Sequence, residues 1–115
     1  MKNNATIRKA TSQDTDTIHE IITSYSREGI LLSRSLDDIS HSIENFFVAE
    51  IGSVIVGVIT FYDYGDHLKE VRSLAVNRNY LRRGIGSALL QALITHLRAA
   101  NTPRIFVLTY TPAFF

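Results

Sequence analysis

The residues of this chain that are best suited to chemistry form one short loop, Arg82-Arg83-Gly84-Ile85-Gly86-Ser87. The loop follows a stretch expected to be a strand and opens a stretch with helical spacing. The first turn of a helix leaves backbone N–H groups without helical partners, and the helix dipole adds partial positive charge there. The two glycines let that backbone approach a ligand, and the two arginines add charge. The pattern predicts an anion site suited to a pyrophosphate; the alternative is a plain glycine-rich turn into a helix.

The same loop differs from the two commonest phosphate-binding patterns. Position 89 is leucine, so the pattern G-x-G-x-x-G of dinucleotide-binding folds is not completed. The loop also does not end in the Lys-Ser or Lys-Thr pair of a P-loop. Ser87 has no histidine or aspartate at a motif spacing, so a hydrolase triad is not supported.

Histidines and tyrosines are weaker candidates. The four histidines are scattered without the spacing of metal ligands, so we expect surface or lightly buried residues and no metal. Tyr62 and Tyr64 could line a pocket, although packing at the core or its rim is the favoured interpretation. A catalytic role for Tyr110 is likewise less favoured than a structural one.

Helices are indicated by periodicity on both sides of the chain's middle. Positions 18, 21, 22 and 25 are apolar or aromatic at helical spacing, and so are positions 85, 89, 90, 93, 94 and 97. Ser35, with Asp38 three residues later, resembles a capping box and predicts a second helix between these two. Leu36, Ile39 and Ile43 would form its apolar face.

Strands fill most of the remaining sequence. Gly52-Ser53 separates two aromatic and β-branched runs, which predicts a hairpin. Residues 68–76 do not alternate cleanly, as expected for a central strand with both faces covered. The resulting order, β-α-α-β-β-β-α-β, is an α/β (α+β) fold without repeats or a linker, so residues 1–115 should form a single domain. The expected strands are residues 5–9, 46–51, 54–62, 68–76 and 104–109.

Composition excludes several classes of function. The 115 residues carry a net charge of +1, without the basic excess of a nucleic-acid-binding protein. The chain has no cysteine, so a disulfide framework and a thiolate metal site are excluded. The N-terminus lacks the apolar run of a signal peptide, and no apolar stretch reaches the roughly 18 residues of a membrane span. We therefore expect a cytoplasmic protein without a nucleic-acid or membrane partner.

The segment from Glu70 to Leu90, E-V-R-S-L-A-V-N-R-N-Y-L-R-R-G-I-G-S-A-L-L, resembles motif A of the GNAT N-acetyltransferases in the order and length of its strand, loop and helix. Gly84 and Gly86 match the family pattern Q/R-x-x-G-x-G/A, whereas Leu81 replaces its Gln or Arg. The resemblance implies the GNAT fold, with a mixed, mostly antiparallel central sheet flanked by helices, and acetyl-CoA as co-substrate.

The same resemblance assigns roles along motif A. Backbone from Arg82 to Ser87, Ile85 included, would hold the CoA pyrophosphate, and the main chain of Leu74, Ala75 and Val76 would pair with the pantetheine arm. Glu70 lies where many family members place a catalytic glutamate, which would take a proton from the amine directly or through water. The alternative for Glu70 is an ordinary exposed glutamate in a strand.

Further stretches, namely G-I-L-L-S-R-S-L-D-D-I, F-F-V-A-E, V-R-S-L-A-V and L-T-Y-T-P-A-F-F, resemble the acetyltransferase domain of N-acetylglutamate synthases. That resemblance implies glutamate as acceptor and a place in arginine biosynthesis. Arg34 and Arg72, with Ser73, would bind the carboxylates, because the arginine fork matches a carboxylate. The alternative is that both arginines are solvated surface residues.

In this resemblance the chain is short at its C-terminus, where the family usually adds a helix and two strands and often supplies a tyrosine as the acid. A second interpretation is therefore a domain that binds acetyl-CoA without catalysis, and a third is an enzyme with another small amine as acceptor. The apolar strand at residues 104–109 would have an open edge, and Phe114-Phe115 would add exposed rings. Both predict a homodimer through the C-terminal strand.

Overall fold

The computed structural model describes residues 4–65, 68–100 and 104–107. Five strands of this part form one sheet in the order β1-β2-β3-β4-β5. The pairs from β1 to β4 are antiparallel, and β5 runs parallel to β4. The strands are β1 (Thr6–Lys9), β2 (Phe46–Ile51), β3 (Val54–Asp63), β4 (Leu68–Val76) and β5 (Arg104–Val107).

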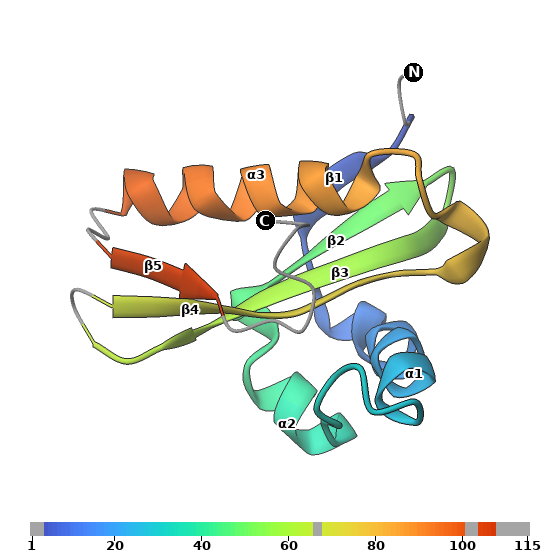
Figure 1. The fold of residues 1–115 in the computed structure, drawn as a ribbon, viewed down its shortest axis with the longest axis horizontal. Coiled ribbons are helices and arrows are strands. Elements are labelled where there is room, and N and C mark those ends of the chain that lie inside the picture. The colour runs from blue at the N-terminus through green and yellow to red at the C-terminus, as the bar shows by residue number, and fades with distance from the viewer. Residues whose placement is uncertain (1–3, 66–67, 101–103, 108–115) are drawn as a thin grey trace.

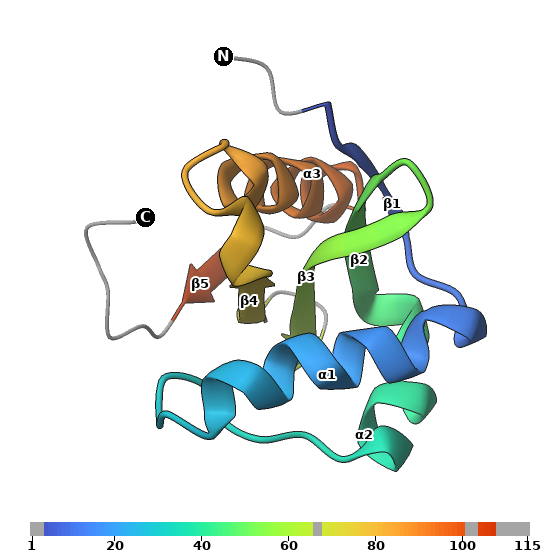
Figure 2. The same ribbon diagram turned by 90° about the vertical axis from the view of Figure 1, so that its right-hand side faces the viewer.

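Helices cover both faces of the sheet. The α3 helix (Ile85–Ala99) lies along one face, and α1 (Thr15–Ser26) and α2 (Leu36–His41) lie on the other (Figures 1 and 2). Three short 3-10 turns, at Ser12–Asp14, Ile43–Asn45 and Arg78–Tyr80, join these elements. The predicted element order and the predicted mixed, mostly antiparallel sheet are both confirmed.

The sheet separates two apolar cores. Along β2, Phe46 and Val48 pack with the buried isoleucines of α1 and α2, whereas Phe47 and Ala49 pack with the leucines of α3. Successive strand side chains point to opposite faces, so a continuous apolar run such as β2 serves both cores. This explains why the central strands show no polar alternation.

Local caps fix where the helices start. The backbone N–H of Asp38 donates to the hydroxyl of Ser35 at 3.1 Å, so the predicted cap of α2 is confirmed. Ile39 is fully buried, but Leu36 is 44% exposed, so the expectation that Leu36 faces the core was wrong. Ahead of α1, the Thr11 N–H donates to the carboxylate of Asp14 at 2.8 Å.

The start of α3 lies unusually close to β3. A Cβ atom at Gly57 would stand 2.9 Å from the Leu89 side chain and 3.2 Å from that of Ile85. Because Gly57 has no side chain, the first turns of α3 can pack closely on the sheet. This contact fixes the position of the loop that precedes α3.

The last strand was expected to reach residue 109; positions 108 and 109 lie outside the described residues. Within the described part, no helix has the length and apolar character needed to cross a membrane.

Candidate active site

An irregularity in β4 shapes the centre of the site. Val58 pairs with Ala75, but Thr60 pairs with Arg72, so two residues of β4 stand opposite one residue of β3. Such a bulge adds one residue to the strand and increases its local bend. Ser73 has φ of +54°, a left-handed conformation that is uncommon for residues other than glycine.

The bulge changes which face each side chain of β4 occupies. Val71 and Val76 are five positions apart and would point to opposite faces of a regular strand, yet both belong to the α3 core. Before the bulge, Glu70 and Arg72 flank Val71 and so turn toward the opposite face, where α1 and α2 lie. The bulge thus lets one strand serve both the α3 core and a polar site.

The outer edge of β4 is paired over only half its length. β5 pairs with Leu68 to Val71, and no described strand pairs with that edge from Arg72 to Val76 (Figure 1). A strand edge of this kind offers backbone N–H and C=O groups to another extended chain or to an amide-containing ligand.

One carbonyl on this edge is already engaged. The Asn77 N–H donates to the Val56 carbonyl at 2.7 Å, inside the sheet. The peptide is planar and trans, so the carbonyl of Val76 must point the other way, toward the open edge. There it accepts a hydrogen bond of 2.6 Å from the Tyr25 hydroxyl. The open backbone groups are therefore those nearer the bulge.

The glycine-rich loop has the backbone expected of an anion site. Arg82 and Gly84 have φ of +63° and +80°, and α3 begins immediately afterwards, with the Ala88 N–H bonded to the Gly84 carbonyl at 3.0 Å. The two neighbouring arginines differ in position. Arg82 lines the groove described next, whereas Arg83 is not among its lining residues and lies 5.1 Å from the ring centre of Tyr80.

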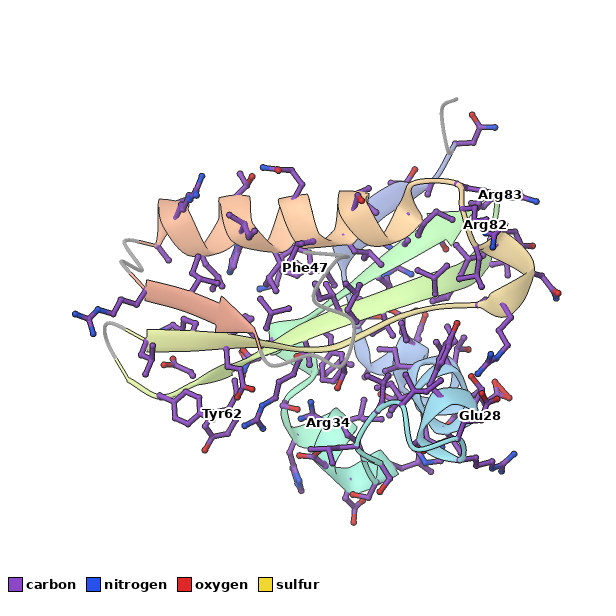
Figure 3. The ribbon with its side chains drawn as sticks, viewed as in Figure 1. Glu28, Arg34, Phe47, Tyr62, Arg82 and Arg83 are labelled. Carbon is purple, nitrogen blue, oxygen red and sulfur yellow. The ribbon has the colours of Figure 1, made fainter. Side chains whose placement is uncertain are left out.

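A groove of about 1470 Å³ joins the loop to the open edge of β4 and continues toward α2. Figure 3 shows Arg82 near one end of the sheet and Tyr62 near the other, with Arg34 between them in this view. All the residues to which the sequence assigned a catalytic, cofactor-binding or acceptor-binding role line this groove except Arg83. Tyr110, a weaker candidate, lies outside the described residues. The lining predicted residues are Arg34, Glu70, Arg72, Ser73, Leu74, Ala75, Val76, Arg82, Gly84, Ile85, Gly86 and Ser87.

Glu70 is buried, with 5% of its surface exposed, and forms a compact cluster. Its Oε1 accepts hydrogen bonds of 2.8 Å from the Tyr64 hydroxyl and from Nε of Arg72. The described residues provide no partner for Oε2, yet no buried side-chain oxygen in the described part lacks a partner. It follows that Oε2 reaches accessible space, where it could accept a proton.

Tyr64 is the residue that sequence reasoning undervalued. Its hydroxyl also accepts a hydrogen bond of 2.9 Å from Nη2 of Arg72. The hydrogen bond to Glu70 is the main cause that raises the pKa of Tyr64 above its usual 10. The guanidinium of Arg72 lies 4.5 Å from the ring centre of Tyr62, and the two tyrosine rings meet edge to face at 4.7 Å. Tyr62, Tyr64, Glu70 and Arg72 occupy alternate positions on the two sides of the hairpin. Only this alternation could have suggested from the sequence that the two tyrosines contact Glu70 and Arg72.

Arg34 approaches the same region from the loop before α2. Its Nη1 donates to the Ser73 hydroxyl at 3.3 Å, and its Nε donates to Asp38 at 2.8 Å. The guanidinium lies 5.3 Å from the ring centre of Phe46. Ser73 follows Arg72 directly, so the structure brings together the three residues proposed for carboxylate binding. Among the described residues, no group of three or more metal-ligating side chains is positioned to hold a metal ion.

Comparison with known proteins agrees with this geometry. Residues 13–113 match the model of the acetyltransferase (GNAT) family. The chain belongs to the GNAT acetyltransferase family. This makes it an acyltransferase. Its strand β4, glycine-rich loop and helix α3 line a single groove.

Two relatives are similar to this chain over most of its length. An uncharacterized N-acetyltransferase of Chlorobaculum tepidum is 35% identical over 109 residues, which are 95% of this chain and 70% of the relative. An amino-acid acetyltransferase of Pseudomonas fluorescens is 33% identical over 104 residues, 90% of this chain but 24% of the relative. The chain thus spans about a quarter of the length of the latter protein.

Two solved structures also resemble this chain. Rv2747 from Mycobacterium tuberculosis, in complex with CoA and NLQ, superposes with a TM-score of 0.91 at 29% identity, covering 96% of this chain and 68% of that chain. N-acetylglutamate synthase from Neisseria gonorrhoeae, complexed with coenzyme A and N-acetyl-glutamate, superposes with a TM-score of 0.92 at 28% identity. The match covers 96% of this chain and 27% of the synthase chain.

Proposed function

We propose that this GNAT domain transfers the acetyl group of acetyl-CoA to the amine of glutamate. The observation that carries the proposal is the single groove that connects the glycine-rich loop with Glu70 and two arginines. A donor bound at the loop and an acceptor bound at the arginines would meet beside the open edge of β4. Bringing two reactants together in a fixed orientation supplies a large part of the rate enhancement in such reactions.

The cofactor end of the groove fits an extended, anionic thioester. Backbone from Arg82 to Ser87 would hold the pyrophosphate at the start of α3, where the helix dipole favours negative charge. The edge of β4 near Leu74 and Ala75 would pair with the amide-containing arm. An N–H group of this edge would polarise the thioester carbonyl and stabilise the charge that develops on its oxygen.

Glu70 supplies the base in this mechanism. An ammonium acceptor must lose a proton before its nitrogen can attack, and Oε2 of Glu70 is open to receive that proton directly or through one water. Oε1 is held by Tyr64 and Arg72 at 2.8 Å each. The nitrogen–carbon bond then forms, the carbon–sulfur bond breaks, and the departing thiolate takes up a proton from water.

Two arginines support an acidic acceptor. Arg72 keeps Nη1, and Arg34 keeps Nη2, without a partner among the described residues, so each guanidinium retains donors for a carboxylate. The similar structures that contain N-acetyl-glutamate or L-arginine belong to N-acetylglutamate synthase, which is the support for glutamate and for a role in arginine biosynthesis. The reaction would take place in the cytoplasm.

A second candidate is a domain that binds acetyl-CoA without turnover. The observation that favours it is the ion pair between Glu70 and Arg72, in which the carboxylate is already neutralised by a cation 2.8 Å away. The two candidates share the cofactor end of the groove and differ only at the acceptor end.

A thiol-release assay separates the two candidates. Acetyl-CoA is incubated with glutamate, aspartate, lysine, spermidine or a peptide with a free N-terminus, and CoA binding is measured in parallel by calorimetry. The proposed function requires CoA binding together with a preference for glutamate. Binding without thiol release from any amine supports the second candidate, and a preference for a cationic amine contradicts the proposed acceptor.

Assembly through β5 is part of the same proposal. In the described part of the sheet β5 pairs with β4 on one side only, so its other edge is available to a second copy. An unpaired apolar edge is a template for strand pairing between chains, and a twofold pair is its commonest closed form. Light scattering at micromolar concentration should give the mass of a dimer, and a stable monomer would contradict this.

A further inference from the structure

The hairpin between β3 and β4 brings three side chains into a closed ring of hydrogen bonds. The Tyr64 hydroxyl lies 2.8 Å from Oε1 of Glu70 and 2.9 Å from Nη2 of Arg72, and Nε of Arg72 lies 2.8 Å from the same Oε1. Each member therefore contacts both of the others. The backbone holds the tyrosine in place, because the Tyr64 N–H donates to the Leu68 carbonyl at 3.0 Å.

The chemistry of the three groups fixes the direction of each hydrogen bond. A guanidinium has donors only, and an ionised carboxylate has acceptors only. The hydroxyl of Tyr64 must therefore accept from Arg72 and send its own proton to Glu70. With both donors on Oε1, the second oxygen of Glu70 is left facing accessible space.

We propose that Tyr64 is a positioning residue for acetyl transfer: its hydroxyl locks Glu70 and Arg72 together, so that Oε2 of the glutamate faces the amine while the arginine faces the acceptor's carboxylate. The inference rests on the proposed function and adds a residue to it. A carboxylate with one oxygen pinned keeps its other oxygen in one orientation, and catalytic groups must hold productive geometry within about 0.5 Å.

The proton itself passes from the amine nitrogen to Oε2 of Glu70, and the phenol keeps its own proton throughout. The raised pKa of Tyr64, caused mainly by the hydrogen bond to Glu70, agrees with a phenol that stays neutral at physiological pH. It makes Tyr64 a poor proton donor to the thiolate, which is why we assign positioning and not acid catalysis. Asp63 and Lys69 form the other described charged pair of this hairpin, with Nζ of Lys69 2.7 Å from Oδ1 of Asp63.

The hairpin offers a matched control for the experiment. Tyr64→Phe removes the bridging hydroxyl and keeps the ring, whereas Tyr62→Phe removes a hydroxyl two residues away that contacts neither Glu70 nor Arg72 in the structure. Steady-state rates with glutamate are measured from pH 5 to 9 for the parent and both variants. CoA affinity and melting temperature are measured on the same samples.

In Tyr64→Phe we expect kcat to fall by about 10- to 100-fold, the range of one lost hydrogen bond to a charged group. CoA affinity should stay within about twofold, because each 1.4 kcal/mol is tenfold and no cofactor contact is removed. KM for glutamate should rise in the same variant, because Arg72 loses the hydroxyl that holds its guanidinium in place. Neither kcat nor KM is expected to change in Tyr62→Phe.

A purely structural role predicts a different pattern and would overturn the inference. In that case both variants would show the same small loss, CoA affinity and melting temperature would fall with the rate, and KM for glutamate would not change in Tyr64→Phe. If the parent acetylates another amine but not glutamate, the proposed acceptor is wrong, and the same comparison with that amine still tests Tyr64. Absence of turnover with every amine overturns both proposals.

Discussion

The hydroxyl of Tyr25, in α1, donates a hydrogen bond of 2.6 Å to the carbonyl oxygen of Val76, 51 positions later in the chain. The guanidinium of Arg78 lies 4.2 Å from the centre of the Tyr25 ring and pairs with Glu28 at 2.8 Å. The end of β4 is thus tied to α1. A ligand that pairs with β4 meets an edge whose last carbonyl is already bonded.

Removing this hydroxyl should loosen the tie without disturbing the core. Tyr25→Phe is expected to lower the free energy of unfolding by about 1 kcal/mol, the net worth of one hydrogen bond. Because this hydrogen bond fixes the end of the β4 edge that lines the groove, CoA affinity should fall as well. Denaturant unfolding and calorimetry measure the two effects, and unchanged CoA affinity would show that the hydrogen bond between Tyr25 and Val76 does not contribute to binding.

The glycine-rich loop gives a prediction about two adjacent arginines. Arg82→Ala should weaken CoA binding by about tenfold, since one charge-assisted contact contributes about 1.5 kcal/mol. Arg83→Ala should weaken it clearly less, because Arg83 does not line the groove and packs on Tyr80. Calorimetry with CoA compares the two variants. Equal losses would mean that Arg83 turns into the groove when CoA is bound.

Gly84 is the most sensitive backbone position of the loop. Its φ of +80° is unfavourable for any residue with a Cβ, and Gly84→Ala should cost about 1–2 kcal/mol of stability. Gly84→Asp should also abolish CoA binding, because it places a negative charge where the pyrophosphate is expected. A folded Gly84→Asp protein, shown by its circular dichroism spectrum, that binds CoA as the parent does would place the phosphate site elsewhere.

Glu70 should matter for the rate far more than for cofactor affinity. Glu70→Gln is nearly isosteric and is expected to lower kcat by about 10²- to 10⁴-fold if the side chain is the general base. The pH–rate profile of the variant should also differ from that of the parent. A variant that keeps the parent's profile would remove Glu70 from the mechanism.

Acceptor preference should depend on the arginines of the groove. Arg72→Gln is expected to raise KM for glutamate by about tenfold or more, because a bidentate contact with a carboxylate is lost. Arg78→Gln is the control, since Arg78 pairs with Glu28 outside that groove. KM values for glutamate and lysine test this, and an equal rise in both arginine variants would argue against a specific carboxylate contact.

Acid should destabilise the chain through Asp14. Two hydrogen bonds from Arg8, at 2.8 and 3.1 Å, are the main cause that lowers the pKa of Asp14 below its usual 3.8. The stabilisation is therefore complete above pH 3.8 and is lost as the pH falls through the lower, folded-state value. Asp14→Asn should lose about 2 kcal/mol of unfolding free energy at pH 7 and depend less on pH near 4. Urea titrations at several pH values measure both.

Local signals were enough to predict most of the fold. The cap at Ser35, the hairpin around Gly52 and the strand, loop and helix of motif A were all readable, because each depends on residues close in sequence. Leu36 was assigned to the wrong face, since the orientation of a two-turn helix is set by tertiary packing. Helical spacing alone does not decide which side of such a short element is covered.

The site could be predicted only in part for a related reason. The bulge at Ser73 depends on the register between β3 and β4, which no spacing within β4 reveals. The contact between Tyr64 and Glu70 depends on how the hairpin turns, so the sequence did not distinguish Tyr64 from Tyr62. Arg82 and Arg83 share a motif, yet of these two only Arg82 lines the groove, and the motif does not reveal the left-handed backbone at Arg82.

The extra residue of β4 separates what its core face needs from what its polar face needs. Deleting Ser73 would restore a regular strand in which Val71 and Val76, now four positions apart, still share the α3 face. The deletion would therefore spare the core and remove the bend, together with the hydroxyl that Arg34 reaches. We expect an insertion between Val71 and Val76 to be more disruptive than this deletion, because it would turn one of the two valines away from α3.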